Sequence, residues 1–233
     1  MMRNLVGVLG GMGPEATILL QQRLLATVVA YDDADHIPLL IDMNPQVPSR
    51  IAHLIEGTGI DPAPTLARMA QRLEAAGATA LAMPCNTAHH YAPQIAAAVS
   101  VPLLNMVDLS VVHAVRCAPD AATIGMLASP AVQRAGVFDA AFRGANLSAL
   151  WPEDADRMLH AIRSIKAHGP TSEARQILQD AAHELVGNGA DLLFVACSEF
   201  SLLAPDLHAA VPVIDTIDVL ARAIRDHTQM ESS

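Results

Sequence analysis

The residues Met83-Pro84-Cys85-Asn86-Thr87-Ala88-His89-His90-Tyr91 stand between a short apolar run and a segment with helical periodicity. The apolar run, residues 79–82, predicts a buried strand, and residues 91–99 predict a helix. The cysteine and its two small hydrogen-bonding neighbours are therefore expected where a strand ends and a helix begins. A second apolar run, residues 191–196, leads directly into Cys197-Ser198-Glu199. The sequence thus predicts two corners of the same kind, each carrying a cysteine.

Strand-like apolar runs alternate with amphipathic segments along the whole chain. Continuous apolar strands separated by helices are typical of parallel sheets covered on both faces, in which ligands bind at the carboxyl ends of the strands. Strands are predicted at residues 5–10, 37–42, 79–84, 102–105, 122–128, 147–151, 191–196 and 212–215. Helices are predicted at residues 14–30, 64–76, 91–99, 130–142, 154–167, 172–186 and 217–227.

The sequence also contains an internal repeat. Val6-Gly-Val-Leu-Gly-Gly matches Ile124-Gly-Met-Leu-Ala-Ser, and a Gly-Ala pair begins eight residues before each of the two cysteines. Further on, Val101-Pro-Leu-Leu-Asn-Met-Val-Asp108 matches Val211-Pro-Val-Ile-Asp-Thr-Ile-Asp218. We therefore expect an α/β fold of two similar lobes, each a mostly parallel sheet flanked by helices. A pseudo-twofold axis is expected to relate the lobes, with the active site in the cleft between them.

The repeat also predicts where the lobes divide. Lobe one is expected to comprise residues 1–104 and 212–233 and to carry Cys85. Lobe two is expected to comprise residues 105–211 and to carry Cys197. The last residues, Met230-Glu-Ser-Ser233, are expected to fray.

Composition excludes several classes of protein. Hydrophobic residues make up 52% of the 233 and charged residues 16%, yet no apolar stretch is long enough to span a bilayer. The Gly-rich turn after the first apolar run argues against an export signal. Three cysteines without a C-x-x-C pair predict neither a disulfide framework nor a zinc ribbon, and free thiols favour a reducing, cytoplasmic location. A formal charge of −10 without a basic stripe makes nucleic acid an unfavourable partner.

The two corners favour proton transfer. The N-terminus of a helix stabilises a thiolate, and backbone N–H groups at the same place can hold a carboxylate. Asn86, Thr87 and Ser198 would add side-chain donors. Two such corners facing one ligand would form a two-base device, in which one sulfur removes a proton from a carbon and the other returns a proton from the opposite face. Such a reaction inverts a stereocentre.

Three motifs together resemble the aspartate/glutamate racemase family, on its aspartate racemase side. They are Leu9-Gly-Gly-Met-Gly-Pro-Glu-Ala-Thr17, Pro84-Cys-Asn-Thr-Ala-His89 and Cys197-Ser-Glu199, and the likeness covers nearly the whole chain. The resemblance implies a racemase of an acidic amino acid, aspartate foremost, that works without pyridoxal phosphate or another cofactor and without metal. It implies that Cys85 and Cys197 are the paired acid and base, and that the protein forms a homodimer.

The resemblance also assigns substrate-binding residues. The segment from Asn44 to Ile51 matches a family segment whose Arg binds a substrate carboxylate, with Ser49 and Ile51 replacing Asp and Thr, and it assigns that role to Arg50. Lys166 matches the family's second cation. His89 and Glu199 are expected to contact the cysteines rather than the substrate. The remaining substrate-binding residues implied are Gly11, Met12, Asn86, Thr87, Ser129 and Ser198.

Two departures from the family pattern leave the substrate open. After the fifth strand the family has hydroxyl side chains where this chain has Val132 and Phe138. A pocket without those donors would favour a different or less polar substrate. A related enzyme of the hydantoin racemase or maleate isomerase type is therefore an alternative, whereas an arylmalonate decarboxylase uses one cysteine and would leave Cys197 unexplained. Cys117 lacks the surroundings of a corner and is expected to pack.

Other classes of function explain fewer of these residues. Residues 11–16 fit a weak dinucleotide fingerprint, but the second half of the repeat lacks its glycines. His89 and His90 are adjacent on a helix, point apart, and do not predict a metal site. A cysteine hydrolase would use one Cys–His pair and leave the second cysteine without a role. A non-catalytic protein that binds a dicarboxylate remains possible on these residues.

Overall fold

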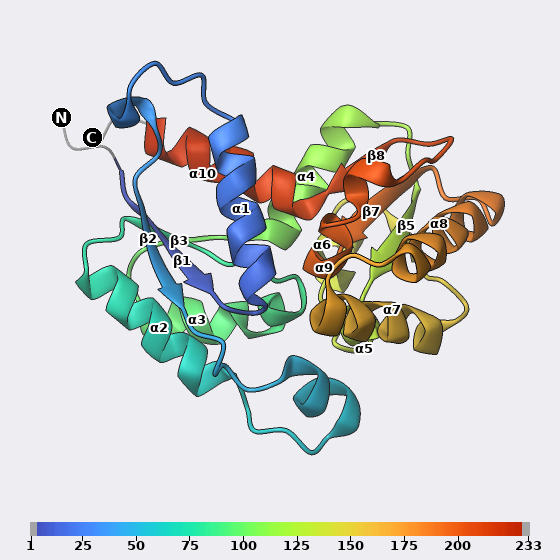
Figure 1. Ribbon diagram of the computed structural model, residues 1–233, viewed down its shortest axis with the longest axis horizontal. Helices are drawn as coiled ribbons and strands as arrows, with labels where there is room; N and C mark the ends of the chain where they lie inside the picture. The colour runs from blue at the N-terminus through green and yellow to red at the C-terminus, as the bar shows by residue number, and fades with distance from the viewer. Residues whose placement is uncertain (1–3, 230–233) are drawn as a thin grey trace.

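The computed structural model describes residues 4–229, so the residues from 230 onward that were expected to fray lie outside it. Two lobes lie side by side, with α4 (Met106–Cys117) and α10 (Thr216–Gln229) running between them (Figure 1). Within residues 4–229, no helix is long and apolar enough to cross a membrane.

Each lobe is built on a four-stranded parallel sheet, and the two sheets have the same topology. The first has the order β2-β1-β3-β4 and the second β6-β5-β7-β8. The predicted two-lobed α/β fold is confirmed, and each observed strand falls at a predicted position. The strands are β1 (Val6–Gly10), β2 (Leu39–Met43), β3 (Ala80–Ala82), β4 (Leu103–Leu104), β5 (Thr123–Ala128), β6 (Ser148–Leu150), β7 (Leu192–Ala196) and β8 (Val213–Asp215).

The internal repeat has a physical cause at the middle of each sheet. A Cβ added to Gly7 would lie 2.9 Å from the Cβ of Leu73, and one added to Gly125 would lie 3.1 Å from the Cβ of Leu185. In both lobes the same kind of helix, α2 (Ala63–Ala75) or α8 (Ser172–Gly187), therefore packs directly on a glycine of the first strand of its lobe. Each sheet thus accepts its helix only because the strand has no side chain there.

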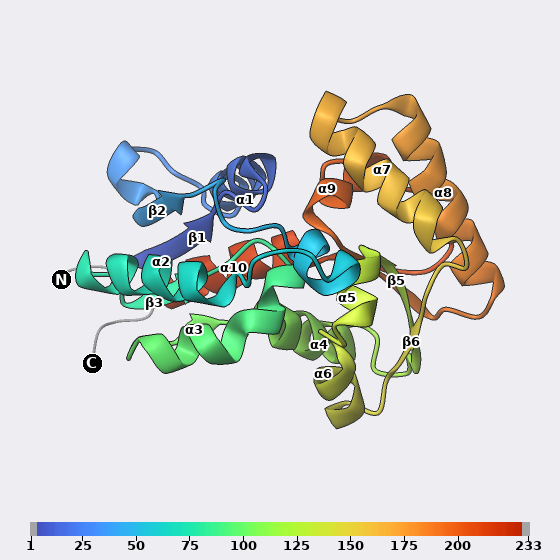
Figure 2. The ribbon, with the colours of Figure 1, turned by 90° about the horizontal axis from the view of Figure 1, so that it is seen from below.

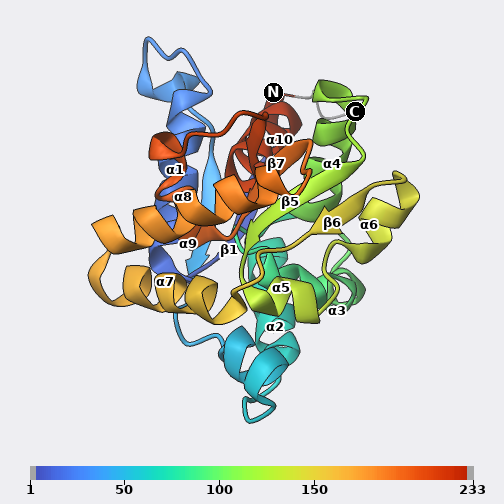
Figure 3. The same cartoon turned by 90° about the vertical axis from the view of Figure 1, so that its right-hand side faces the viewer.

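The helices cover both faces of each sheet, with one exchange between the lobes. The second sheet lies between α7 and α8 on one side and α4 and α6 on the other (Figure 3). α4 follows a strand of the first sheet but packs mainly on the second. α10 follows a strand of the second sheet but packs mainly on the first, beside α1. The remaining helices are α1 (Pro14–Ala26), α3 (Ala92–Ala98), α5 (Pro130–Arg134), α6 (Asp139–Gly144), α7 (Ala155–His168) and α9 (Ser198–Ser201).

This exchange bears on the expected division of the chain. Residues 212–233 were assigned to the first lobe; α10 packs there, whereas β8 pairs with β7 in the second sheet. The lobe boundaries themselves stay a prediction. The sequence also predicted one helix over residues 130–142, and the structure has α5 and α6 instead. Gly136 separates them, with a φ of +59° that the interior of a helix does not allow.

Candidate active site

The loops after β1 and β2 lie against each other because of one glycine. Gly11 has a φ of +88°, and a Cβ at this position would lie 2.4 Å from the carbonyl carbon of Asn44. The close approach brings the segment after β2 to the end of the first strand. That segment continues through Arg50 into a π-helical turn, Ala52–Glu56, which lies beside α5 of the other lobe (Figure 2).

A cavity of about 520 Å³ lies between the lobes at the carboxyl ends of the central strands. Cys85, which follows β3, and Cys197, which follows β7, both line this one cavity. Loops after β1 and β5 contribute Gly11 and Ser129. The predicted site residues that line the cavity are Gly11, Met12, Arg50, Cys85, Thr87, Ser129, Lys166, Cys197 and Glu199.

The Cys197 thiol is held by a carboxylate. Its Sγ donates to Oε2 of Glu199 at 3.0 Å, and it stands before α9, a helix of only four residues. Burial raises the pKa of Cys197 well above its ordinary value, and the negative charge of Glu199 and its hydrogen bond add to this. The sequence predicted a helix end that would favour the thiolate. The structure favours the protonated thiol instead, because burial and the neighbouring carboxylate both oppose the thiolate and the helix is only four residues long.

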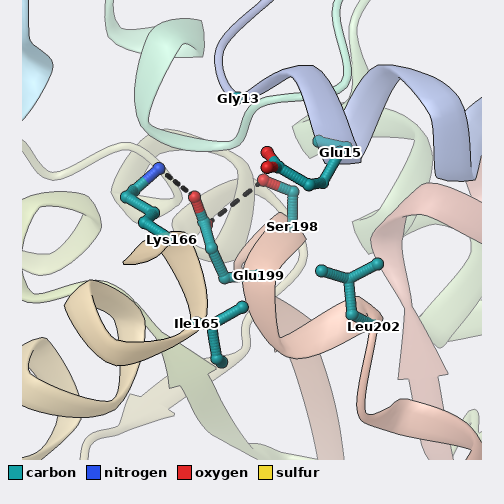
Figure 4. Close-up of a pocket in the computed structure, with 8 residues that line it drawn as sticks. Gly13, Glu15, Ile165, Lys166, Ser198, Glu199 and Leu202 are labelled. Carbon is teal, nitrogen blue, oxygen red and sulfur yellow. Dashed lines mark hydrogen bonds and ion pairs between the residues drawn. The ribbon is translucent and has the colours of Figure 1, made fainter. Parts of the chain in front are cut away.

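Glu199 is in turn paired with Lys166. Oε1 of Glu199 forms an ion pair with Nζ of Lys166, and Oε2 also accepts from Oγ of Ser198 at 3.3 Å (Figure 4). Burial alone would raise the pKa of Glu199, but the lysine charge and the hydrogen bonds outweigh it and lower the pKa. Burial alone would lower the pKa of Lys166, and Glu199 raises it. The pair is therefore fully charged.

Removing the Glu199 charge should expose the reactivity of Cys197. In Glu199→Gln, the pKa of Cys197 is expected to fall because Lys166 would act on the thiolate unopposed. More of the sulfur is then thiolate at pH 8, so alkylation of Cys197 by iodoacetamide at that pH should be clearly faster than in the unmodified protein. Glu56→Gln is the matched control, because that cavity carboxylate pairs with Arg163 instead. Equal alkylation rates in both variants would contradict the assignment.

His89 connects the backbone of Cys85 to the start of α4. It is buried, its Nδ1 lies 2.9 Å from the carbonyl oxygen of Cys85, and its Nε2 accepts from the backbone N–H of Met106 at 3.1 Å. The first contact requires the proton on Nδ1 and the second a free Nε2, so the ring is the neutral Nδ1–H tautomer. Burial lowers its pKa to about 4, although the hydrogen bond to Cys85 opposes the shift.

The neutral histidine makes stability depend on pH. The unfolded chain binds a proton at this residue below about pH 6.5 and the folded chain only near 4, so stability is lost as the pH falls between these values. The free energy of unfolding should fall by about 3 kcal/mol over this pH range because of His89 alone. Buried Asp215 has its pKa raised to about 6 by burial and acts in the opposite sense. We therefore expect the His89→Gln variant, measured by urea unfolding from pH 7 to 4, to lack this part of the loss; parallel curves for both proteins would exclude it.

Some predicted residues do not reach the cavity. Asn86 donates its amide N–H to Oγ1 of Thr216 at 2.9 Å, so it joins the lobes rather than lining the site. Ser198 lines a small pocket beside Glu15 (Figure 4). Val132 and Phe138 are buried in the core of the second lobe and do not line the cavity, so the expectation that they face the pocket was wrong; a less polar substrate stays a prediction.

Further site expectations have mixed outcomes. Cys117 was expected to pack and is exposed instead. Residues 4–229 contain no group of three or more His, Cys, Asp or Glu side chains placed to hold a metal ion.

The sequence did not predict several residues that line the cavity, most of which lie within a few positions of predicted ones. They are Gly13, Pro14, Glu15, Pro45, Val47, Ser49, Ile51, Glu56, Ile162 and Arg163.

Arg50 has one guanidinium nitrogen bonded to its own loop and another without a partner. Nη1 donates to the carbonyl oxygens of Pro48 at 3.0 Å and Val47 at 3.3 Å. Nε is buried and has no acceptor among residues 4–229. A buried donor without a partner is costly, so a site of this kind favours an acceptor supplied from outside the chain. A carboxylate fits the planar arrangement of such donors.

Comparison with known proteins shows relatives along nearly the whole chain. The family model for Asp/Glu/Hydantoin racemase matches residues 9–224. The broad specificity amino-acid racemase RacX of Bacillus subtilis is 25% identical over 227 residues, covering 94% of this chain and 96% of that protein. The solved structure of the Picrophilus torridus aspartate racemase is similar with a TM-score of 0.84 and 26% identity, covering 99% of this chain and 96% of that one.

A second solved structure extends the likeness in fold. It is an aspartate racemase homologue from Pyrococcus horikoshii, with a TM-score of 0.75 and 18% identity, covering 99% of this chain and 100% of that one. The match of the family model over residues 9–224 decides the classification. The chain belongs to the Asp/Glu/Hydantoin racemase family and is an amino-acid racemase.

Proposed function

We propose that the chain racemises an α-amino acid by a two-base mechanism in which Cys85 and Cys197 act from opposite faces of the substrate. The observation that carries the proposal is that both thiols line one cavity, from equivalent positions of a repeated fold. One sulfur, as thiolate, removes the α-proton. The other, as thiol, delivers its own proton to the opposite face of the carbon. The reaction exchanges the protonation states of the two sulfurs and requires no cofactor.

The surroundings of Cys197 support a starting state for this cycle. Because Cys197 is buried and its thiol donates a hydrogen bond to the charged Glu199, the resting enzyme carries a thiol at this corner. Cys85 is then the residue that removes the first proton, and Cys197 the one that returns a proton. After one turnover the roles are reversed, and the opposite enantiomer becomes the substrate. Lys166 lies on the far side of Glu199 and limits the repulsion that a second thiolate would meet.

Two substrate classes are proposed for this site. Aspartate is the first, as the resemblance implies and as the likeness to the Picrophilus torridus aspartate racemase supports. Its two carboxylates would need both Arg50 and Lys166. The second is an amino acid with an uncharged side chain, because Glu199 already occupies Lys166 and Arg50 keeps a buried donor without a partner. The likeness to a broad specificity amino-acid racemase supports this second class.

Deuterium exchange tests the proposal directly. The protein is incubated in D₂O with single enantiomers of aspartate, glutamate, alanine, methionine and leucine, and Cα deuterium and chirality are followed together. Deuterium is expected to enter at Cα with inversion for at least one of these amino acids. Tight binding of aspartate without any exchange would show a dicarboxylate-binding protein instead. A homodimer and a cytoplasmic location stay predictions.

A further inference from the structure

The side chain four residues after each cysteine reaches back to the carbonyl of that cysteine. In the first lobe this side chain is His89, whose Nδ1 lies 2.9 Å from the carbonyl oxygen of Cys85. In the second lobe it is Ser201, which is fully buried and whose Oγ lies 3.4 Å from the carbonyl oxygen of Cys197. The two residues differ in chemistry, yet they occupy equivalent positions of the repeat.

Each of these side chains also contacts the start of the helix that follows the next strand. Nε2 of His89 accepts from the N–H of Met106, the first residue of α4. Oγ of Ser201 donates at 2.8 Å to Oδ1 of Asp215, which in turn accepts from the N–H of Ile217 in the first turn of α10. Asp215 is equivalent in the repeat to Asn105, the residue that caps α4 in the same way.

α4 and α10 are the two helices that the lobes exchange. α4 packs mainly on the core of the second lobe and α10 mainly on the core of the first. The hydrogen bond that His89 accepts from the first residue of α4 therefore connects the Cys85 corner to a helix that packs on the opposite lobe. Ser201 makes the corresponding connection for the Cys197 corner through Asp215. A third set of hydrogen bonds connects the first corner to the second sheet. Thr216, the first residue of α10, accepts from the Asn86 side chain and donates at 3.1 Å to the carbonyl oxygen of Val195 in β7.

We propose that His89 and Ser201 are equivalent positioning residues, which fix the two thiols relative to each other through the helices exchanged between the lobes. The inference rests on the two-base function proposed above. Proton transfer in such a mechanism requires each sulfur to lie in line with the α-carbon on its own face. A misplacement of about 1 Å can cost about a hundredfold in rate. Buried hydrogen bonds are suited to hold that geometry, because neither side chain needs to touch the substrate. His89 bonds both the Cys85 carbonyl and the N–H of Met106. Ser201 gives its one hydroxyl proton to Asp215 at 2.8 Å, while its backbone N–H donates to the Cys197 carbonyl at 3.0 Å.

The experiment compares variants that delete or retain the two contacts. His89→Leu and Ser201→Ala remove them, and His89→Gln and Ser201→Thr retain a donor at each place. Ser110→Ala is the matched control, since it deletes another fully buried hydroxyl, one that bonds only the carbonyl of Met106 within α4 and contacts neither cysteine corner. Each variant is assayed for kcat, KM and the isotope effect of Cα-deuterated substrate, separately for each enantiomer.

Each enantiomer loses its proton to a different cysteine, so the isotope effect reports which thiol is misplaced. His89→Leu and Ser201→Ala are expected to lower kcat about tenfold to a hundredfold, and each to raise the isotope effect with a different enantiomer. The Gln and Thr variants should recover most of the rate, and Ser110→Ala should stay within about twofold of the unmodified protein. Deletion variants that behave like Ser110→Ala, or that both raise the isotope effect with the same enantiomer, would overturn the inference. Failure of the two-base function would show differently, as full activity without Cys85 or Cys197.

Discussion

Replacing Cys197 by serine is expected to lower the rate of racemisation at least about a thousandfold, which corresponds to about 4 kcal/mol of transition-state free energy. Replacing Cys85 by serine should have an effect of the same size. An alcohol is a much weaker acid than a thiol, and each pKa unit of mismatch between proton donor and proton acceptor costs about 1.4 kcal/mol. The serine hydroxyl fills nearly the same space as the thiol, so the loss reports chemistry rather than packing.

Cys117→Ser is the control that separates chemistry from the mere loss of a thiol. Cys117 is exposed on α4 and does not line the cavity, so this variant should racemise at the rate of the unmodified protein. Chiral chromatography with each enantiomer as starting material gives the rates in both directions. If Cys85→Ser and Cys197→Ser both stay within tenfold of the unmodified protein, the two sulfurs are not the acid and base.

The architecture could be predicted because its determinants are local in the sequence. Buried parallel strands need continuous apolar runs, and the packing of α2 and α8 needs Gly7 and Gly125, so both features recur visibly in each half of the chain. The ends of the strands then locate both cysteines. The bounds of one helix could not be predicted in this way. Gly136 divides the helix predicted over residues 130–142, because its left-handed conformation depends on its neighbours.

The electrostatic state of the site could not be predicted in the same way. Lys166 and Glu199 are 33 residues apart and meet only because α7 packs beside α9. The sequence placed both residues near the site but predicted an activated thiolate at Cys197, whereas burial and the neighbouring Glu199 raise the pKa of Cys197 and keep it a thiol. Val132 and Phe138 show the converse error, since a family position alone does not reveal whether a side chain faces the cavity or the core.

Replacing Arg50 by glutamine is expected to lower kcat/KM by about 10²- to 10³-fold, the usual effect of removing one donor from a site that stabilises developing negative charge. Loss of the α-proton moves electron density onto the carboxylate, so a cation on that carboxylate binds the transition state more tightly than the substrate. The loss should therefore appear in kcat as well as in KM. Arg50→Lys keeps the charge without the planar pair of donors and should lose less.

The Arg50 variants also decide how the substrate is oriented. Arg72→Gln is the control, because Arg72 belongs to the same lobe but pairs with Asp42 away from the cavity, and its kcat/KM should be unchanged. An increase in KM alone in Arg50→Gln would mean that the guanidinium binds a group whose charge does not change during proton transfer, such as a side-chain carboxylate. A normal kcat/KM would mean that the unpartnered Nε of Arg50 does not contact the substrate, and the α-carboxylate would then have to be held at the opposite wall, near Lys166.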